Sequence, residues 1–217
     1  MKKTALAGLL AGLLAFPLLQ GCVPVIAAGV TTSALATFDR RSYGTQTDDE
    51  GIEWKASATV MEKVSDKAHI NFTSYNRRVL LSGEVPSEEA RLQAEQLTLA
   101  TPNVKGIYNE LTVGPASSFG DRSNDSFITS KVKSRFVDSG KFNAVHVKVV
   151  TEAGSVFLLG LVTQAEANSA IQVARTTAGV KKVVNLLEII TPAQARELDI
   201  AQKGSGNAPA PAPVEKP

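Results

Sequence analysis

Residues 78–85 read RVLLSGEV, and residues 155–162 read SVFLLGLV. The two stretches share a glycine, Gly83 in the first and Gly160 in the second, 77 residues apart. Each is a short apolar run with the length and composition of a β-strand. Related elements that recur at a fixed spacing indicate a duplicated unit, so the sequence predicts two copies of one small domain.

The elements on either side of these strands follow the same order in both copies. An apolar residue at every fourth position predicts an amphipathic helix at the start of each copy, and alternating apolar residues predict the strand that follows. The predicted helices are residues 52–64, 87–100, 128–136 and 164–177, and the predicted strands are residues 68–72, 78–85, 106–113, 145–149, 155–162 and 182–190. Ser123, Asn124 and Asp125 are N-cap candidates for the helix that opens the second copy.

These elements predict an α+β fold of two tandem αββαβ units. A hairpin makes the first two strands of each unit antiparallel, and the helical crossover makes the last two parallel. We therefore expect a small three-stranded mixed sheet in each unit, packed on two helices. The first unit is expected to span residues 48–114 and the second residues 121–191.

The first 21 residues predict a lipoprotein signal peptide. Lys2 and Lys3 precede an apolar stretch that is too short and too interrupted for a membrane span. Residues 19–22 (LQGC) resemble the bacterial lipobox, so we expect cleavage before Cys22 and a covalent N-acyl diacylglycerol on this cysteine, with no other cofactor. Residues 22–47 are then a lipidated N-terminus and tether, and residues 204–217 (GSGNAPAPAPVEKP) a disordered Pro/Ala-rich tail.

The charge balance and the cysteine count exclude several classes of function. The chain has 23 Lys and Arg against 21 Asp and Glu, and loss of the signal peptide with its two lysines leaves a neutral chain. A neutral chain without a basic run lacks the electrostatic term that drives nucleic-acid binding. A single cysteine excludes an intramolecular disulfide. The chain also lacks a nucleophile elbow, a P-loop and an HExxH motif, so we expect a protein that is not an enzyme.

Two histidines occupy equivalent positions in the two units. His69 and His146 lie 77 residues apart, each at the start of a predicted strand. One histidine per unit without a cysteine nearby is a weak basis for a metal site, so we interpret both as exposed strand residues and predict no metal site.

Two charged pairs lie at or just before the start of the first unit. Asp48 and Asp49 are expected to open the first helix, where acidic residues favour the helix dipole. The Arg40–Arg41 pair is interpreted as part of a solvated linker, with contact to lipid headgroups or a partner protein as the alternative.

Each unit resembles the BON domain of bacterial envelope proteins. The resemblance rests on the hydrophobic-Gly-x-Val element and on the closing motif in residues 179–185 (GVKKVVN), which in the first copy has Asn103 in place of the glycine. With the lipobox and residues 39–49 (DRRSYGTQTDD), the chain resembles the dual-BON outer-membrane lipoproteins of the DolP type. This resemblance implies a non-enzymatic, lipid-anchored protein on the periplasmic face of the outer membrane. The family further implies binding of anionic phospholipid through the second BON unit and a role in envelope integrity, and Val23 after the cysteine is typical of outer-membrane lipoproteins.

The first helix of the second unit carries a candidate membrane surface. Ile128, Val132 and Phe136 share one side of a helical wheel, which must face the sheet. The candidate phospholipid-binding residues on and beside the opposite side are Phe127, Ser130, Lys131, Lys133, Ser134 and Val137. An outward aromatic residue bordered by lysines is typical of a helix that lies among lipid headgroups.

Two alternatives stay open at this point. Phe127 could pack against the other unit, with the lysines on an ordinary solvated face. The protein could also be a periplasmic adaptor that contacts outer-membrane assembly or secretion proteins, or the cell wall.

In the first unit, we expect Trp54 and Met61 to be covered by packing between the units.

Overall fold

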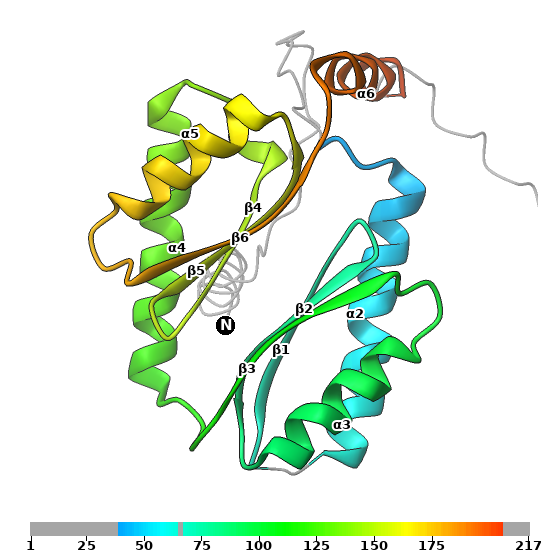
Figure 1. Cartoon of the computed structure of the whole chain (residues 1–217), viewed down its shortest axis with the longest axis vertical. Coiled ribbons are helices and arrows are strands. Elements are labelled where there is room, and N and C mark those ends of the chain that lie inside the picture. The colour runs from blue at the N-terminus through cyan, green and yellow to red at the C-terminus, as the bar shows by residue number, and fades with distance from the viewer. Residues whose placement is uncertain (1–38, 65–66, 206–217) are drawn as a thin grey trace, which may run out of the picture. The chain divides into compact units, whose positions relative to one another are not determined.

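The computed structural model describes residues 39–64 and 67–205 (Figure 1). The predicted signal peptide, Cys22 and the tether up to residue 38 lie outside the described residues, as does the tail from residue 206. The elements in chain order are α2 (Tyr43–Lys63), β1 (His69–Tyr75), β2 (Arg78–Val85), α3 (Glu88–Leu99), β3 (Gly106–Val113), α4 (Phe119–Ser139), the 3-10 helix η2 (Ala144–His146), β4 (Lys148–Glu152), β5 (Ser155–Val162), α5 (Gln164–Arg175), β6 (Lys182–Ile189) and α6 (Pro192–Ser205).

The strands form two three-stranded sheets with the same topology. Their orders are β1-β2-β3 and β4-β5-β6. In each sheet the first two strands pair antiparallel as a hairpin, and the last two pair parallel across a helix. The α+β class and the tandem αββαβ repeat are therefore confirmed.

Each sheet is covered on one face by its own two helices, as Figure 1 shows. In the second repeat, Ile128, Val132 and Phe136 of α4 pack with small residues of α5 on one face of the sheet. In the first repeat, α2 and α3 pack in the same way on the sheet β1-β2-β3. The period of four in the sequence therefore marks the buried side of each opening helix.

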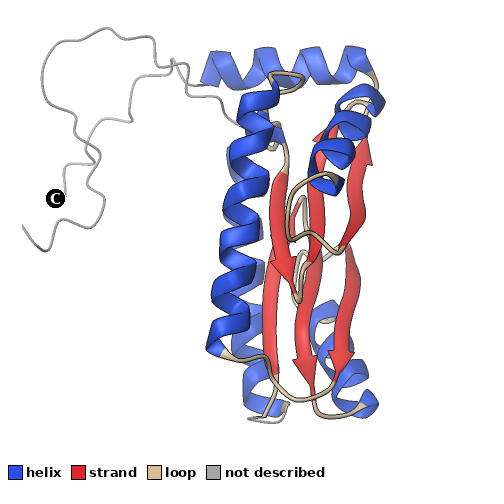
Figure 2. Cartoon of the chain, turned by 90° about the vertical axis from the view of Figure 1, so that its left-hand side faces the viewer, coloured by secondary structure: helices blue, strands red, loops and turns tan. Residues whose placement is uncertain are grey.

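The other face of each sheet is also buried, because the two sheets contribute to a shared apolar cluster. Tyr75 and Leu80 from the first sheet pack with Phe157, Leu159 and Leu186 from the second. Alternate residues of β2 and β5 thus face a helix layer or this cluster, which explains why both strands read as almost uninterrupted apolar runs. Figure 2 shows helices flanking the strands, with a long helix running alongside them.

The opening helices begin earlier than the apolar period predicts. α4 starts at Phe119 with Ser118 as N-cap, in a capping box with Asp121, so the N-cap candidates at residues 123–125 are wrong. α2 starts at Tyr43 with Ser42 as N-cap, inside the segment predicted as tether. The period of four did not predict these starts, because the positions that continue it towards the N-terminus are not apolar: they are Gly44 and Asp48 in α2, and Gly120 and Asn124 in α4.

Two further boundaries differ from the prediction. Residues 145 and 146 belong to η2 and not to a strand, so β4 begins three residues later than expected. Helix α6 was not predicted, and it extends through residues 204 and 205, which were assigned to the tail. It begins with Pro192, and proline is common at the first position of a helix.

The repeated glycines fit a close approach of the preceding segment. A Cβ atom on Gly83 would overlap the backbone carbonyl oxygen of His69, and one on Gly160 would overlap that of His146. Gly83 also has a φ of +119°, which side chains strongly disfavour. Each glycine therefore lets two backbone segments approach more closely than any other residue would allow.

Candidate functional site

Helix α4 exposes an apolar ridge on the side away from its sheet. Phe119, Phe127 and Val137 are 80%, 62% and 68% exposed, although they are large apolar side chains. At 100° per residue, these three lie on the same side of the helix as Ser130 and Ser134. We call these five residues the α4 outer face. Phe127 does not pack against the other repeat, and the earlier helix start adds Phe119 to the predicted set.

The lysines beside this face have different surroundings. Lys131 donates from Nζ to the backbone oxygen of Ala178 at 2.6 Å and lies 4.7 Å from the centroid of the Phe127 ring. Lys133 is exposed on the other flank. Arg135, in contrast, is bound to the end of α5 through Thr177 and neighbouring groups. Lys133 is thus the flanking lysine whose substitution perturbs the fold least.

Arg40 is buried and binds the second repeat, so its interpretation as a solvated or lipid-facing residue is wrong. Only 4% of it is exposed. Its guanidinium donates two hydrogen bonds to Glu166 of α5, two to Asp199 of α6 and one to the backbone oxygen of Leu161. Arg41 instead binds Asp39 and Asp49 and lies over the Tyr75 ring. The Arg40–Arg41 pair therefore fixes the start of the described chain to both repeats.

His146 lies beside this arginine cluster and is buried, so the prediction of an exposed strand residue is wrong for it. Its ring nitrogens are 3.7 Å from Asp199 and 4.0 Å from Glu166. Burial lowers the pKa of His146, and the charge of Arg40 lowers it further, against the opposing effect of the two acids. Burial disfavours ionisation of Glu166, but hydrogen bonds from Arg40 and Thr163 outweigh it and lower the pKa of Glu166 to about 2.

We expect acid to destabilise the second repeat in two stages. The pKa of His146 lies below its ordinary value of 6.5 in the folded state, so the unfolded state takes up the proton first and stability falls as the pH drops through 6.5. The pKa of Glu166 is depressed from 4.5 to about 2, so its contribution is lost between those values. Urea unfolding midpoints between about pH 7 and 5 should depend less on pH in His146→Gln. An unchanged pH dependence would contradict this.

A buried aspartate fixes the hairpin turn in each repeat. Asp49 accepts hydrogen bonds from the backbone N–H groups of Asn76 and Arg77, at 2.9 and 2.7 Å. Asp125, 76 residues later, accepts from the N–H groups of Ala153 and Gly154 in the same way. The residues at the turns have positive φ, which places these N–H groups together. The expectation that Asp48 and Asp49 open the helix is wrong, because α2 already begins at Tyr43.

His69 is partly buried and belongs to a cluster of three ionisable groups. Its Nδ1 lies 3.2 Å from Oε2 of Glu84, its partner across the hairpin. Glu152 of β4 completes the cluster, and one ligand atom from each residue lies within 4.8 Å of the others. The two histidines therefore have unrelated surroundings, although they are equivalent in the repeat.

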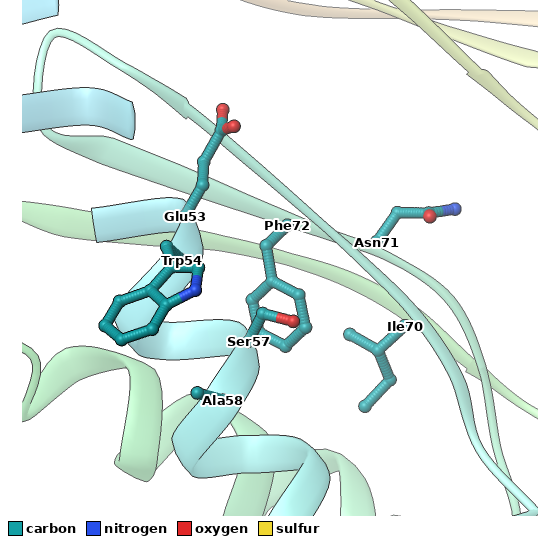
Figure 3. A pocket seen from close by; sticks show the side chains of 7 residues that line it. All are labelled: Glu53, Trp54, Ser57, Ala58, Ile70, Asn71 and Phe72. Atoms are coloured by element: carbon teal, nitrogen blue, oxygen red, sulfur yellow. The ribbon is translucent and has the colours of Figure 1, made fainter. Parts of the chain in front are cut away.

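A groove runs between α2 and the edge strand β1, with a volume of about 460 Å³. Figure 3 shows Trp54 and Ser57 of α2 facing the same hollow as Ile70 and Phe72 of β1. Trp54 is 73% exposed, and Met61, one turn beyond the groove, is also exposed. The expectation that packing between the repeats covers these two residues is wrong.

The described helices differ from membrane spans. Among residues 39–64 and 67–205, none of the helices has the length and apolarity to cross a bilayer. The exposed apolar side chains of α4 are instead confined to one side of an otherwise polar helix.

Comparison with known proteins assigns the repeats to a family. The model of the BON domain matches residues 49–115 and again residues 124–191. The chain belongs to the BON family. The matches cover each αββαβ repeat except the first six residues of α2 and the first five of α4, so the BON domain is the duplicated unit seen in the fold.

Several known proteins resemble the chain over most of its length. The outer membrane lipoprotein DolP of Haemophilus influenzae is 42% identical over 174 residues, which are 79% of this chain and 90% of the relative. The 21 kDa hemolysin of Actinobacillus pleuropneumoniae is 38% identical, covering 70% of this chain and 79% of the relative. The osmotically-inducible protein Y of Escherichia coli is 30% identical, covering 65% of this chain and 72% of the relative.

Proposed function

We propose that this BON-family protein is a lipid-anchored protein of the periplasmic face of the outer membrane, which binds anionic phospholipid through the α4 outer face and supports envelope integrity. The observation that carries the proposal is the exposure of Phe119, Phe127 and Val137 on one side of a helix with Lys133 beside them. The similarity to an outer membrane lipoprotein supports the location. Acylation at Cys22 and lipid contact by α4 are the parts that experiment has to test.

The chemistry of the α4 outer face suits a bilayer interface. Apolar side chains that enter the boundary between headgroups and acyl chains leave water, and nearby lysines meet lipid phosphates. Each cation near an anionic surface contributes about 1 kcal/mol, which is modest alone. An acyl anchor at Cys22 would keep the domain at a high local concentration beside the bilayer, so a weak contact suffices.

Vesicle binding tests this surface. With residues 22–217 carrying Cys22→Ser, which lack the predicted signal peptide, we expect Phe127→Glu and Lys133→Glu each to weaken co-sedimentation with phosphatidylglycerol-containing vesicles about tenfold, because about 1.4 kcal/mol corresponds to a factor of ten. A Lys131/Lys133→Glu double variant should bind still less. This variant also loses the hydrogen bond from Lys131 to the backbone oxygen of Ala178. Circular dichroism of each variant monitors the fold.

Trp54→Glu is the matched control, because Trp54 is an exposed aromatic residue on the corresponding helix of the first repeat. The Trp54→Glu variant should bind vesicles like the parent chain. Equal loss in Trp54→Glu and Phe127→Glu would contradict a specific role for α4, and unchanged binding in a folded Phe127→Glu would remove the proposal.

One observation favours a second candidate, a periplasmic adaptor for outer-membrane assembly proteins. The groove beside Trp54 follows β1, which is an edge strand of its sheet. An edge strand next to an apolar groove can receive an extended protein segment. Under this candidate, pure lipid vesicles would not recruit the Cys22→Ser chain, and Trp54→Glu would impair envelope integrity in cells while Phe127→Glu would not.

A further inference from the structure

His69, Glu84 and Glu152 form a cluster that joins the two BON repeats. His69 and Glu84 are opposite each other on β1 and β2, and Glu152 is the last residue of β4. Both glutamates are buried, and one ligand atom from each of the three residues lies within 4.8 Å of the other two. This brings two carboxylates and one imidazole together from separate domains.

Two buried carboxylates at this distance repel each other unless a positive charge lies between them. Asp125, which lines the same pocket as His69 and Glu152, accepts one backbone N–H group on each of its oxygens. The local electrostatics therefore favour a bound cation.

The two carboxylates are oriented by hydrogen bonds from residues outside the cluster. The backbone N–H of Ser117, in the connector between the repeats, donates to Oε2 of Glu84 at 3.0 Å. The amide of Asn71 donates to Oε2 of Glu152 at 2.8 Å. Partners of this kind hold ligands in place in protein metal sites.

From this arrangement, we infer that His69, Glu84 and Glu152 bind one Zn²⁺ ion, which bridges the two BON repeats. An imidazole with two carboxylates suits zinc better than Mg²⁺ or Ca²⁺, which prefer oxygen ligands. Two ligands on tetrahedral zinc lie about 3.3 Å apart, close to the 3.2 Å between Nδ1 of His69 and Oε2 of Glu84. A pocket of about 330 Å³, lined by His69 and Glu152, gives the ion a path from solvent.

Calorimetric titration with ZnCl₂ tests the site on the untagged full chain. Cys22→Ser removes the thiol as a competing ligand. We expect one saturable site in the parent chain and a rise in Tm with zinc. His69→Gln and Glu152→Gln should bind at least about 100-fold more weakly, because even the loss of an outer partner costs about 10- to 100-fold in metal affinity. Co²⁺ should give a d–d absorption band that both variants lose.

Glu188→Gln is the matched control. Glu188 also joins the repeats, through Asn76 and Arg78, but it lies outside the cluster. The Glu188→Gln variant should bind zinc like the parent chain. Absence of a saturable site in the parent chain would overturn the inference whatever the variants do, as would wild-type affinity in His69→Gln and Glu152→Gln.

Discussion

Asp49→Ala should lower the free energy of unfolding by about 3 to 5 kcal/mol, as expected when one partner of a buried, hydrogen-bonded ion pair is removed. Asp49 is 2% exposed and accepts from Ser74, Arg41 and the two N–H groups of the β1–β2 turn. The alanine variant leaves the guanidinium and the turn without this partner. Urea unfolding followed by circular dichroism measures the loss, with the full Cys22→Ser chain as reference.

The neighbouring residue supplies the control. Asp48 is more exposed than Asp49, and it pairs with Arg77 and accepts from Asn103. Exposed pairs of this kind contribute up to about 1 kcal/mol, so Asp48→Ala should unfold at nearly the parent midpoint. Similar losses in the two variants would mean that Asp49 does not fix the turn as described. Asp125→Ala should destabilise the second repeat by about 1 to 3 kcal/mol, the cost of leaving buried donors unsatisfied, because Asp125 accepts the two N–H groups of its turn.

Gly83→Ala should destabilise the first repeat by about 2 to 6 kcal/mol. A strained backbone costs about 1 to 3 kcal/mol, and overpacking adds about 1 to 3. Both apply at Gly83, because its φ is +119° and a Cβ atom would overlap the carbonyl oxygen of His69. Relief would require β1 and β2 to separate, which the buried residues on both faces of β2 oppose. The urea midpoint measures the loss.

Gly51→Ala tests the same chemical change where the structure accommodates it. A Cβ atom at Gly51, in the middle of α2, meets no heavy atom within 4 Å. Alanine favours helix interiors over glycine by about 0.5 to 1 kcal/mol, so this variant should be slightly more stable than the parent. If Gly83→Ala also unfolds at or above the parent midpoint, the close approach of the two strands does not constrain residue 83.

The order of elements could be predicted from the sequence because it depends on local periodicity. Ile128, Val132 and Phe136 mark the buried side of α4, and the two glycine-containing strands mark the repeat. The packing of one sheet on the other is also marked in the sequence. A strand buried on one face alternates, whereas residues 79–81 and 156–159 are apolar without a break. Ser118 and Asp121, spaced as in a capping box, likewise marked the true start of α4.

The polar clusters could not be predicted in this way, because their members are far apart along the chain. Arg40 binds Asp199, and His69 meets Glu152, through contacts that only the packing of the two repeats creates. The outward residues of α4 could be predicted, since exposure follows directly from the buried side of the same helix. Their contact with lipid stays a prediction.

The contacts of Arg40 also decide how the molecule carries a mechanical load. If the N-terminus is held at a bilayer, any pull on the folded part enters through the residues just before α2. Arg40 is bound there to Glu166 and Asp199, and Arg41 is bound to Asp49 of α2. Tension at the start of the folded part is therefore shared between the two repeats, and neither repeat has to resist it alone.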